Sequence, residues 1–177
     1  MSFRPLRGEE SLHSARCIAI GAGRFVRSLL LPIMEKLQWG TIVVQTRSSN
    51  IAQMFNDRND GSYEMDLVNT DGTTTTQVIR SVDAAGSVGI PENRPVLMNI
   101  TRRLNNLIMI AVCVTEAGLQ QDSDVIQLIF ELLHLRFQSH PTAYLSGVCA
   151  CVCRVVSVLA PILALMPFVC LLCVFFF

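Results

Sequence analysis

The stretch that decides the fold of this chain is Cys17-Ile18-Ala19-Ile20-Gly21-Ala22-Gly23-Arg24-Phe25-Val26-Arg27. Its first four residues are apolar and partly β-branched, which predicts a short buried strand. From residue 24 to residue 38, apolar side chains recur at the spacing of a helix. The sequence therefore predicts a strand and a helix that are joined by a Gly-x-Gly turn.

A strand, a glycine turn and a helix in this order are typical of the opening of a dinucleotide-binding Rossmann fold. The first glycine permits the tight turn, the second lets the backbone approach a pyrophosphate, and the helix N-terminus offers free N–H groups. Val26 replaces the third glycine of the usual pattern, which serves helix–strand packing rather than phosphate contact. A purely structural turn is the alternative. The predicted cofactor contacts in this turn are Gly21, Ala22, Gly23, Arg24 and Phe25.

A second apolar run, residues 41–45, predicts a strand parallel to the first. Its end lies about 20 residues beyond the glycines, where an acid normally binds the ribose 2′-hydroxyl of NAD. Gln45, Thr46 and Arg47 stand there instead. An arginine in this place can bind the 2′-phosphate of NADP, or it can be a solvated loop residue. The cofactor is thus NAD or NADP, with a slight preference for NADP.

The remaining globular part alternates strand and helix signals. Asp71-Gly72 separates two strand-like runs, residues 63–69 and 73–82, which predicts a β-hairpin. Residues 83–95 are rich in glycine and proline and predict a connector. The longest apolar run of the globular part, residues 107–114, predicts another buried strand.

Thr115 and Glu116 follow that strand, so we expect them in the same crevice as the glycine turn. A helix is predicted over residues 125–137. The fold class is α/β, a Rossmann-like parallel sheet with a β-hairpin insertion, followed by a hydrophobic C-terminal helix.

The overall charge argues against a nucleic-acid partner, because 14 basic and 14 acidic residues balance to zero. His134 and His140 share no ligand spacing with cysteines or acids, so no metal site is predicted. No secretory signal opens the chain, and Cys17 and Cys113 fall in predicted buried strands. We therefore expect a cytoplasmic globular part.

Several segments together resemble the long-chain mannitol dehydrogenase family, which includes polyol dehydrogenases and hexuronate reductases. They are the Gly-x-Gly-x-Phe-x-Arg turn, the Asp71-Gly72 hairpin, Val114-Thr115-Glu116-Ala117-Gly118 and Leu132-Leu133-His134-Leu135-Arg136. The similarity covers residues 17–140, and it implies an N-terminal NAD(P)-binding Rossmann domain. The reaction implied is zinc-independent hydride transfer between a nicotinamide ring and a polyol or keto-sugar.

The resemblance also implies a catalytic lysine in a helical C-terminal domain, and no lysine follows Lys36 in this chain. No catalytic residue is therefore assigned. Glu116 is the only carboxylate expected near the nicotinamide, where it could orient a substrate. We expect a truncated oxidoreductase that has cofactor affinity at most and negligible turnover.

The hydrophobic excess of the chain lies at its C-terminus, where residues 155–177 carry no charge. As a helix this segment would span roughly 34 Å, enough for a bilayer core, so a tail anchor in a membrane is one interpretation. Translation of an intron or of a shifted frame is the other. The expected organisation is a flexible lead-in (1–16), the NAD(P)-binding domain (17–146) and a hydrophobic tail or transmembrane helix (147–177).

Two alternatives to the oxidoreductase function remain open at this stage. A membrane-anchored, non-catalytic module could bind nucleotides or partners, or the chain could be a gene-model fragment without a function of its own.

Overall fold

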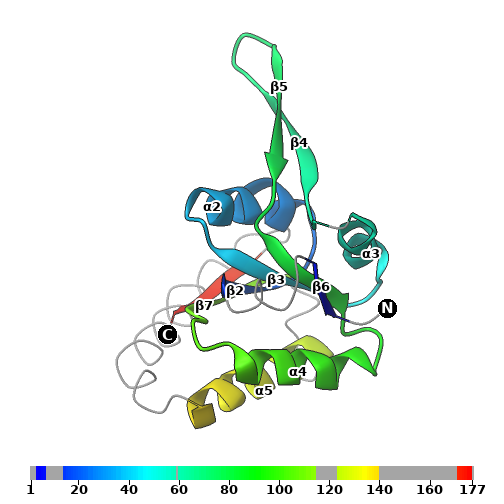
Figure 1. Cartoon of the computed structure of the whole chain (residues 1–177), viewed down its shortest axis with the longest axis vertical. Coiled ribbons are helices and arrows are strands. Elements are labelled where there is room, and N and C mark those ends of the chain that lie inside the picture. The colour runs from blue at the N-terminus through cyan, green and yellow to red at the C-terminus, as the bar shows by residue number, and fades with distance from the viewer. Residues whose placement is uncertain (1–2, 7–13, 59, 115–122, 140–170, 177) are drawn as a thin grey trace, which may run out of the picture.

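The computed structural model describes residues 3–6, 14–58, 60–114, 123–139 and 171–176. A six-stranded sheet forms its centre, in the order β1-β6-β3-β2-β7-β8 (Figure 1). The strands are β1 (Arg4–Pro5), β2 (Ala15–Ile20), β3 (Gly40–Gln45), β6 (Val82–Ser87), β7 (Met109–Val114) and β8 (Leu171–Phe176).

The four inner strands run parallel and have the strand order of a Rossmann half. Ile18 of β2 is paired with Ile42 of β3 on one side and with Ile110 of β7 on the other. On the far side of β3, Val44 is paired with Gly86 of β6. In chain order these strands occupy the spatial order 3-2-1-4, which is the arrangement of dinucleotide-binding sheets. The predicted parallel sheet is confirmed.

Helices cover both faces of the sheet (Figure 1). On one face lie a π-helical segment η1 (Val26–Leu30), which runs directly into α2 (Leu31–Lys36), and α3 (Asn50–Asp57). On the other face lie α4 (Asn93–Arg103) and α5 (Asp124–Ser139).

The side chains of the strands divide between two cores, because successive residues point to opposite faces. Large aliphatic residues such as Ile18, Ile20 and Ile110 pack toward α4 and α5. Smaller side chains such as Ala19 and Ala111 pack under η1 and α2. Their small size lets the continuous helix of η1 and α2 lie close to the sheet.

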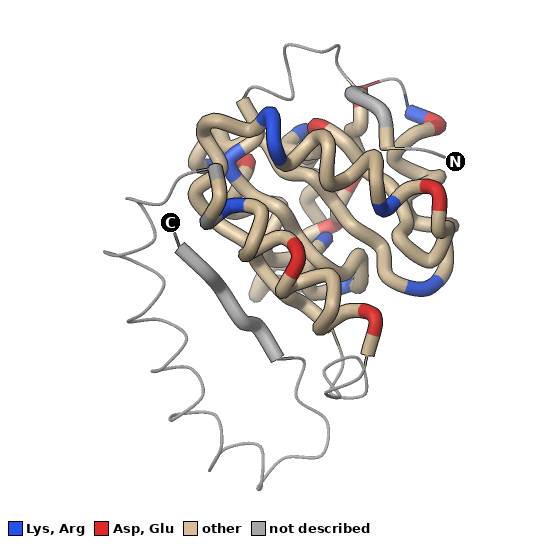
Figure 2. Tube along the Cα trace, turned by 90° about the horizontal axis from the view of Figure 1, so that it is seen from below, with Lys and Arg blue, Asp and Glu red and all other residues tan. Residues whose placement is uncertain are grey.

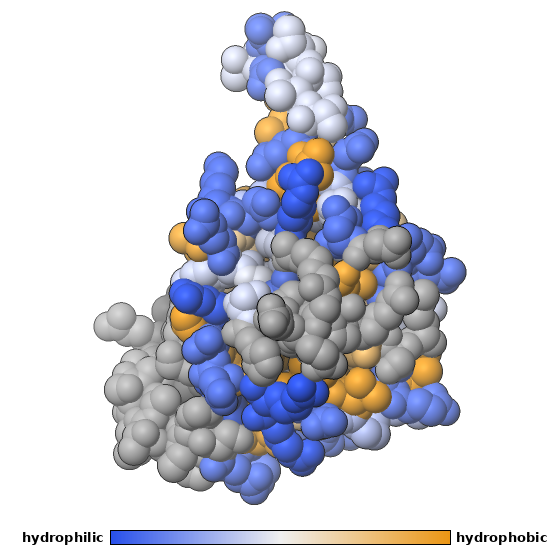
Figure 3. Space-filling view, viewed as in Figure 1, coloured by the Kyte–Doolittle hydropathy of each residue, from blue (hydrophilic) through white to orange (hydrophobic). Residues whose placement is uncertain are grey.

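A hairpin of β4 (Tyr63–Val68) and β5 (Thr74–Ile79) projects from the body (Figure 1). Gly72 has a φ of 81° in its turn, as the predicted Asp-Gly hairpin requires. Figure 3 shows mostly hydrophilic or near-neutral residues at its tip. At its base, the Tyr63 ring packs edge-on against Phe55 of α3, with ring centroids 5.6 Å apart.

The interpretation of residues 83–95 as a connector is wrong for residues 83–87, because β6 lies there as a fully buried strand. Asp83, Ala84 and Ala85 are small or charged and give no apolar strand signal, yet pairing with β3 buries them. Gly40 opens β3, next to β6. A Cβ atom there would lie 1.5 Å from the Asp83 carboxylate.

Both ends of the described chain differ from the sequence expectation. Residues 3–6, assigned to a flexible lead-in, include β1, and the buried Phe3 ring covers Gly86. In the tail, β8 pairs antiparallel with β7 along its whole length, so the predicted helix is wrong for residues 171–176. The outer edge of β7 offers unpaired backbone groups, which an apolar and aromatic strand satisfies.

The rest of the expected tail helix, residues 147–170, lies outside the described residues. Within the described part of the chain, no helix is long and apolar enough to cross a membrane.

Candidate dinucleotide site

The turn after β2 is shaped by Gly21, whose φ of 108° is strained for any residue with a side chain. A Cβ atom on Gly21 would lie only 2.1 Å from the carbonyl oxygen of Cys113 in β7. The Gly21 N–H donates to the carbonyl of Val44 in β3, at 2.7 Å. Gly21 thus lets the chain leave the sheet between its two neighbouring strands.

Gly23 has a different role, because among the described residues no atom beyond its chain neighbours lies within 4 Å of the Cβ position built on it. Its carbonyl accepts the N–H of Arg27 at 3.2 Å, so the helix begins at this residue. The backbone of the turn is therefore open to solvent in front of a helix N-terminus, where N–H groups and the helix dipole favour an anion.

A hollow of about 460 Å³ lies over this turn. The carboxyl ends of β2, β3 and β7 meet here, as expected for the ligand crevice of a parallel sheet. The described residues that line it are Gly21, Ala22, Gly23, Arg24, Arg27, Gln45, Thr46, Arg47, Ser48, Asn50, Ile51, Cys113 and Val114.

The charge of this lining has one sign. Arg24, Arg27 and Arg47 are its charged residues, and no carboxylate stands among the described lining residues. Elsewhere on the described chain, acidic and basic residues are interspersed (Figure 2). The hollow is therefore suited to an anionic ligand such as a pyrophosphate.

The structure brings most of the predicted site residues together. Gly21, Ala22, Gly23, Arg24 and Arg47 line the same hollow. Phe25 does not line it, because its ring packs against the apolar core under the helix. Thr115 and Glu116 lie outside the described residues, directly after Val114.

Sequence reasoning missed Arg27, Ser48 and Asn50, and it considered Gln45 only as the replacement of an acid. Gln45 is buried, and its Oε1 accepts the N–H groups of Ile51 and Ala52 at 3.1 and 3.0 Å. Its Nε2 donates to Ser48 Oγ at 2.5 Å and to Asn50 Oδ1 at 2.8 Å. The sequence feature that could have revealed these residues is the polar run from Gln45 to Asn50, which follows the second strand.

Two buried groups on the side of the sheet that faces the helix are kept neutral by their burial. Burial raises the pKa of the Cys17 thiol to about 12, so this thiol stays neutral inside β2. The Tyr63 hydroxyl donates to the carbonyl oxygen of Arg27, which ties the hairpin to the helix after the turn. Burial also raises the pKa of Tyr63, so its hydroxyl remains a donor.

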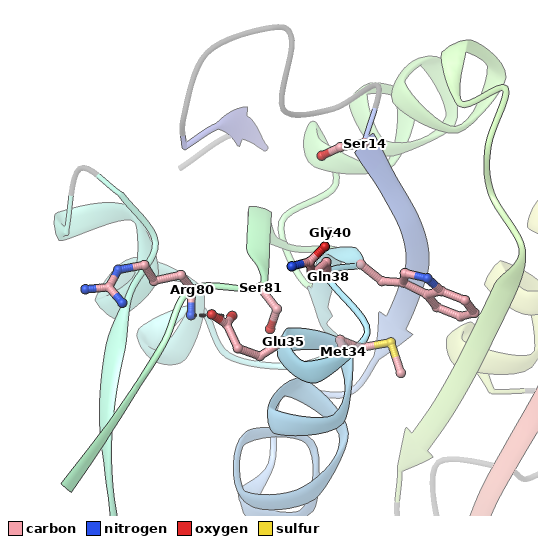
Figure 4. A pocket seen from close by; sticks show the side chains of 8 residues that line it. Ser14, Met34, Glu35, Gln38, Gly40, Arg80 and Ser81 are labelled. Carbon is pink, nitrogen blue, oxygen red and sulfur yellow. Dashed lines mark hydrogen bonds between the residues drawn. The ribbon is translucent and has the colours of Figure 1, made fainter.

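A second hollow, of about 280 Å³, lies at the opposite end of the strands (Figure 4). Glu35 of α2 accepts the backbone N–H of Arg80 at 2.8 Å, and Ser81 Oγ donates to the Leu31 carbonyl at 2.9 Å. These bonds hold the return of the hairpin against α2, which is a structural role.

The residues present fit a dinucleotide. Gly21 permits the tight turn beside β7, the Gly23 backbone is exposed, and the charged residues of the described lining are arginines. Among the described residues, no three His, Cys, Asp or Glu side chains are grouped so that they could hold a metal ion.

The fold and the site are those of a Rossmann domain that binds a dinucleotide. The sequence model of the mannitol dehydrogenase Rossmann domain matches residues 15–164, and the chain belongs to this family. A nicotinamide dinucleotide is the cofactor class that this membership implies.

A solved structure of D-sorbitol dehydrogenase in its substrate-free form has the same fold, with a TM-score of 0.59 at 15% sequence identity. The match covers 72% of this chain and 33% of that enzyme, so the chain spans about a third of its length. The curated protein sequences yield no match.

Proposed function

We propose that this chain binds the pyrophosphate of a nicotinamide dinucleotide on the Gly21–Gly23 turn. The observation that carries the proposal is the exposed backbone of Gly23, in front of a helix N-terminus and beneath a hollow whose charged residues, within the described part of its lining, are arginines. Gly21, Ala22, Gly23 and Arg24 would contact the phosphates. The globular unit that does so is proposed to be residues 17–146.

The residues at the end of the second strand of the chain's parallel sheet favour NADP over NAD as the cofactor. The acid that would bind a ribose 2′-hydroxyl is replaced by Gln45, and the exposed Arg47 side chain follows it on the rim of the hollow. A guanidinium can bind a 2′-phosphate with charge-assisted hydrogen bonds, whereas NAD offers it only a hydroxyl.

The reaction class proposed is hydride transfer between the nicotinamide and a polyol or keto-sugar, as the family and the name of the similar D-sorbitol dehydrogenase suggest. When bound, the nicotinamide supplies the hydride chemistry. The described lining residues include no carboxylate, histidine or lysine that could exchange a proton with the substrate hydroxyl. Glu116 would orient a substrate, and we propose that the chain alone binds its cofactor with negligible turnover.

Isothermal titration of the full chain with NADPH and with NADH tests this function. The proposal predicts saturable binding of one dinucleotide per chain, tighter for NADPH, and no oxidation of NADPH when fructose is added. Absence of binding of both dinucleotides at millimolar concentration would refute it. Equal affinity for both would refute the role of Arg47 alone.

A further inference from the structure

The side chain of Gln45 has no hydrogen-bonding group left for a ligand. A glutamine amide has two N–H donors and an oxygen that accepts two bonds. In this structure Oε1 receives two backbone N–H groups from the first turn of α3, and both Nε2 donors have partners in Ser48 and Asn50. Gln45 therefore cannot bind a ribose hydroxyl without giving up one of these bonds.

The same bonds also remove α3 as an anion site. The N–H groups of Ile51 and Ala52 are the donors that a phosphate would use at this helix N-terminus, and Gln45 Oε1 occupies both. The cation that follows Gln45 on the rim of the hollow is Arg47, in the loop of residues 46–48.

That loop is held from two more sides. Ser87 Oγ of β6 donates to the carbonyl of Ser48 at 2.6 Å. Gly89 lies so close that a Cβ atom on it would be 2.2 Å from the Arg47 carbonyl oxygen. The Arg47 backbone is thus fixed, while its side chain is exposed at the hollow.

We propose that Gln45 is the positioning residue for cofactor selectivity, an inference that rests on the proposed function. Gln45 stands where an acid would bind the ribose, and its side chain is neutral. Its amide oxygen caps the N-terminus of α3. These bonds fix the start of the loop that carries Arg47, whose side chain can then bind a 2′-phosphate. Selectivity for NADPH then depends on two properties of Gln45, its hydrogen bonds and its lack of charge.

Two substitutions separate these properties. Gln45→Glu keeps an oxygen for the two α3 N–H groups, and Ser48 and a rotated Asn50 amide can donate to the other oxygen, so only a negative charge is added. Gln45→Ala removes the bonds and adds no charge. The melting temperature of the full chain is the readout that needs no cofactor.

For Gln45→Glu we expect an unchanged melting temperature, a dissociation constant for NADPH that rises roughly tenfold from like-charge repulsion, and a constant for NADH that changes less than about twofold. For Gln45→Ala we expect a melting temperature lower by a few degrees, roughly what the loss of a helix cap gives, and weaker binding of NADPH.

The outcomes are distinguishable from failure of the proposed function. If the unsubstituted chain binds neither dinucleotide, the proposed function fails, and this inference fails with it. If it binds NADPH but Gln45→Glu leaves the NADPH-to-NADH ratio unchanged, the inference alone is overturned. A Gln45→Ala variant as stable as the unsubstituted chain would overturn the capping role.

Discussion

Substitution of the two glycines of the turn by alanine should separate folding from binding. In Gly21→Ala the new methyl group would be 2.1 Å from the Cys113 carbonyl oxygen, on a backbone with a φ of 108°. Strained backbone costs roughly 1–3 kcal/mol for a residue other than glycine. Displacing β7 to relieve the overlap adds roughly 1–3 kcal/mol more. The free energy of unfolding should therefore fall by about 2–6 kcal/mol.

Thermal denaturation followed by circular dichroism measures this loss. For a domain of this size, about 1 kcal/mol corresponds to roughly 2–4 °C, so the melting temperature of Gly21→Ala should drop by roughly 5–20 °C. Gly23→Ala is the matched control, because its methyl group meets none of the described residues within 4 Å, its chain neighbours aside. It should melt within about 2 °C of the unsubstituted chain, as surface substitutions do.

The affinity for NADPH should be reduced in the variant that keeps its stability, Gly23→Ala. In Gly23→Ala the methyl group would stand where a pyrophosphate approaches the backbone, so NADPH should bind about tenfold or more weakly, although the fold is intact. A Gly21→Ala variant that melts with the unsubstituted chain would refute the close approach of the turn to β7. A Gly23→Ala variant with unaltered NADPH affinity would refute the assignment of the phosphate site.

Three further predictions concern the surroundings of the turn. Arg47→Ala should weaken NADPH binding by about tenfold and leave NADH binding unchanged, as titration calorimetry can show. Tyr63→Phe removes the hydrogen bond to the Arg27 carbonyl and should lower the free energy of unfolding by about 1 kcal/mol in urea titrations. Burial raises the pKa of Cys17 from 9.0 to about 12, so the thiol ionises first in the unfolded chain and its stabilising contribution is complete only below pH 9. That contribution should fall by about 1 kcal/mol between pH 9 and pH 10, and urea titrations of Cys17→Ala should show a shallower decline over this interval.

Local signals in the sequence were sufficient for the centre of the fold. An apolar run before Gly21 and an apolar run after Gln38 each had the length and residue types of a buried strand, and the structure pairs them in parallel. Asp71-Gly72 predicted the hairpin, because this dipeptide favours the φ values of its turn. Polar residues at the expected strand ends likewise predicted where the hollow would form.

Features that depend on tertiary contacts could not be predicted in this way. Strand β6 is buried by its neighbours although Asp83, Ala84 and Gly86 give no strand signal. Apolar residues occupy two faces of the helix after the turn, and the sheet buries the face of Val26, Leu30 and Met34, so that Leu29 and Ile33 remain 45% and 42% exposed. Both outcomes follow from packing against segments far away in the chain.

The site shows the same division. The glycine positions are set by local backbone needs, and the sequence revealed them. The cap that Gln45 forms on α3 depends on the direction of one side chain, which no spacing specifies. Residues 171–176 of the tail could not be predicted from local sequence either, because pairing with the free edge of β7 makes them a strand rather than part of a helix.

Hydrogen–deuterium exchange of the full chain with and without NADPH tests the central claim most directly. If the dinucleotide is held by the turn, NADPH should slow amide exchange in residues 21–27 and 45–51, and leave residues 34–40 and 80–81 at the other end of the sheet unchanged. Protection confined to that opposite end, or no protection at a saturating concentration of NADPH, would contradict the account.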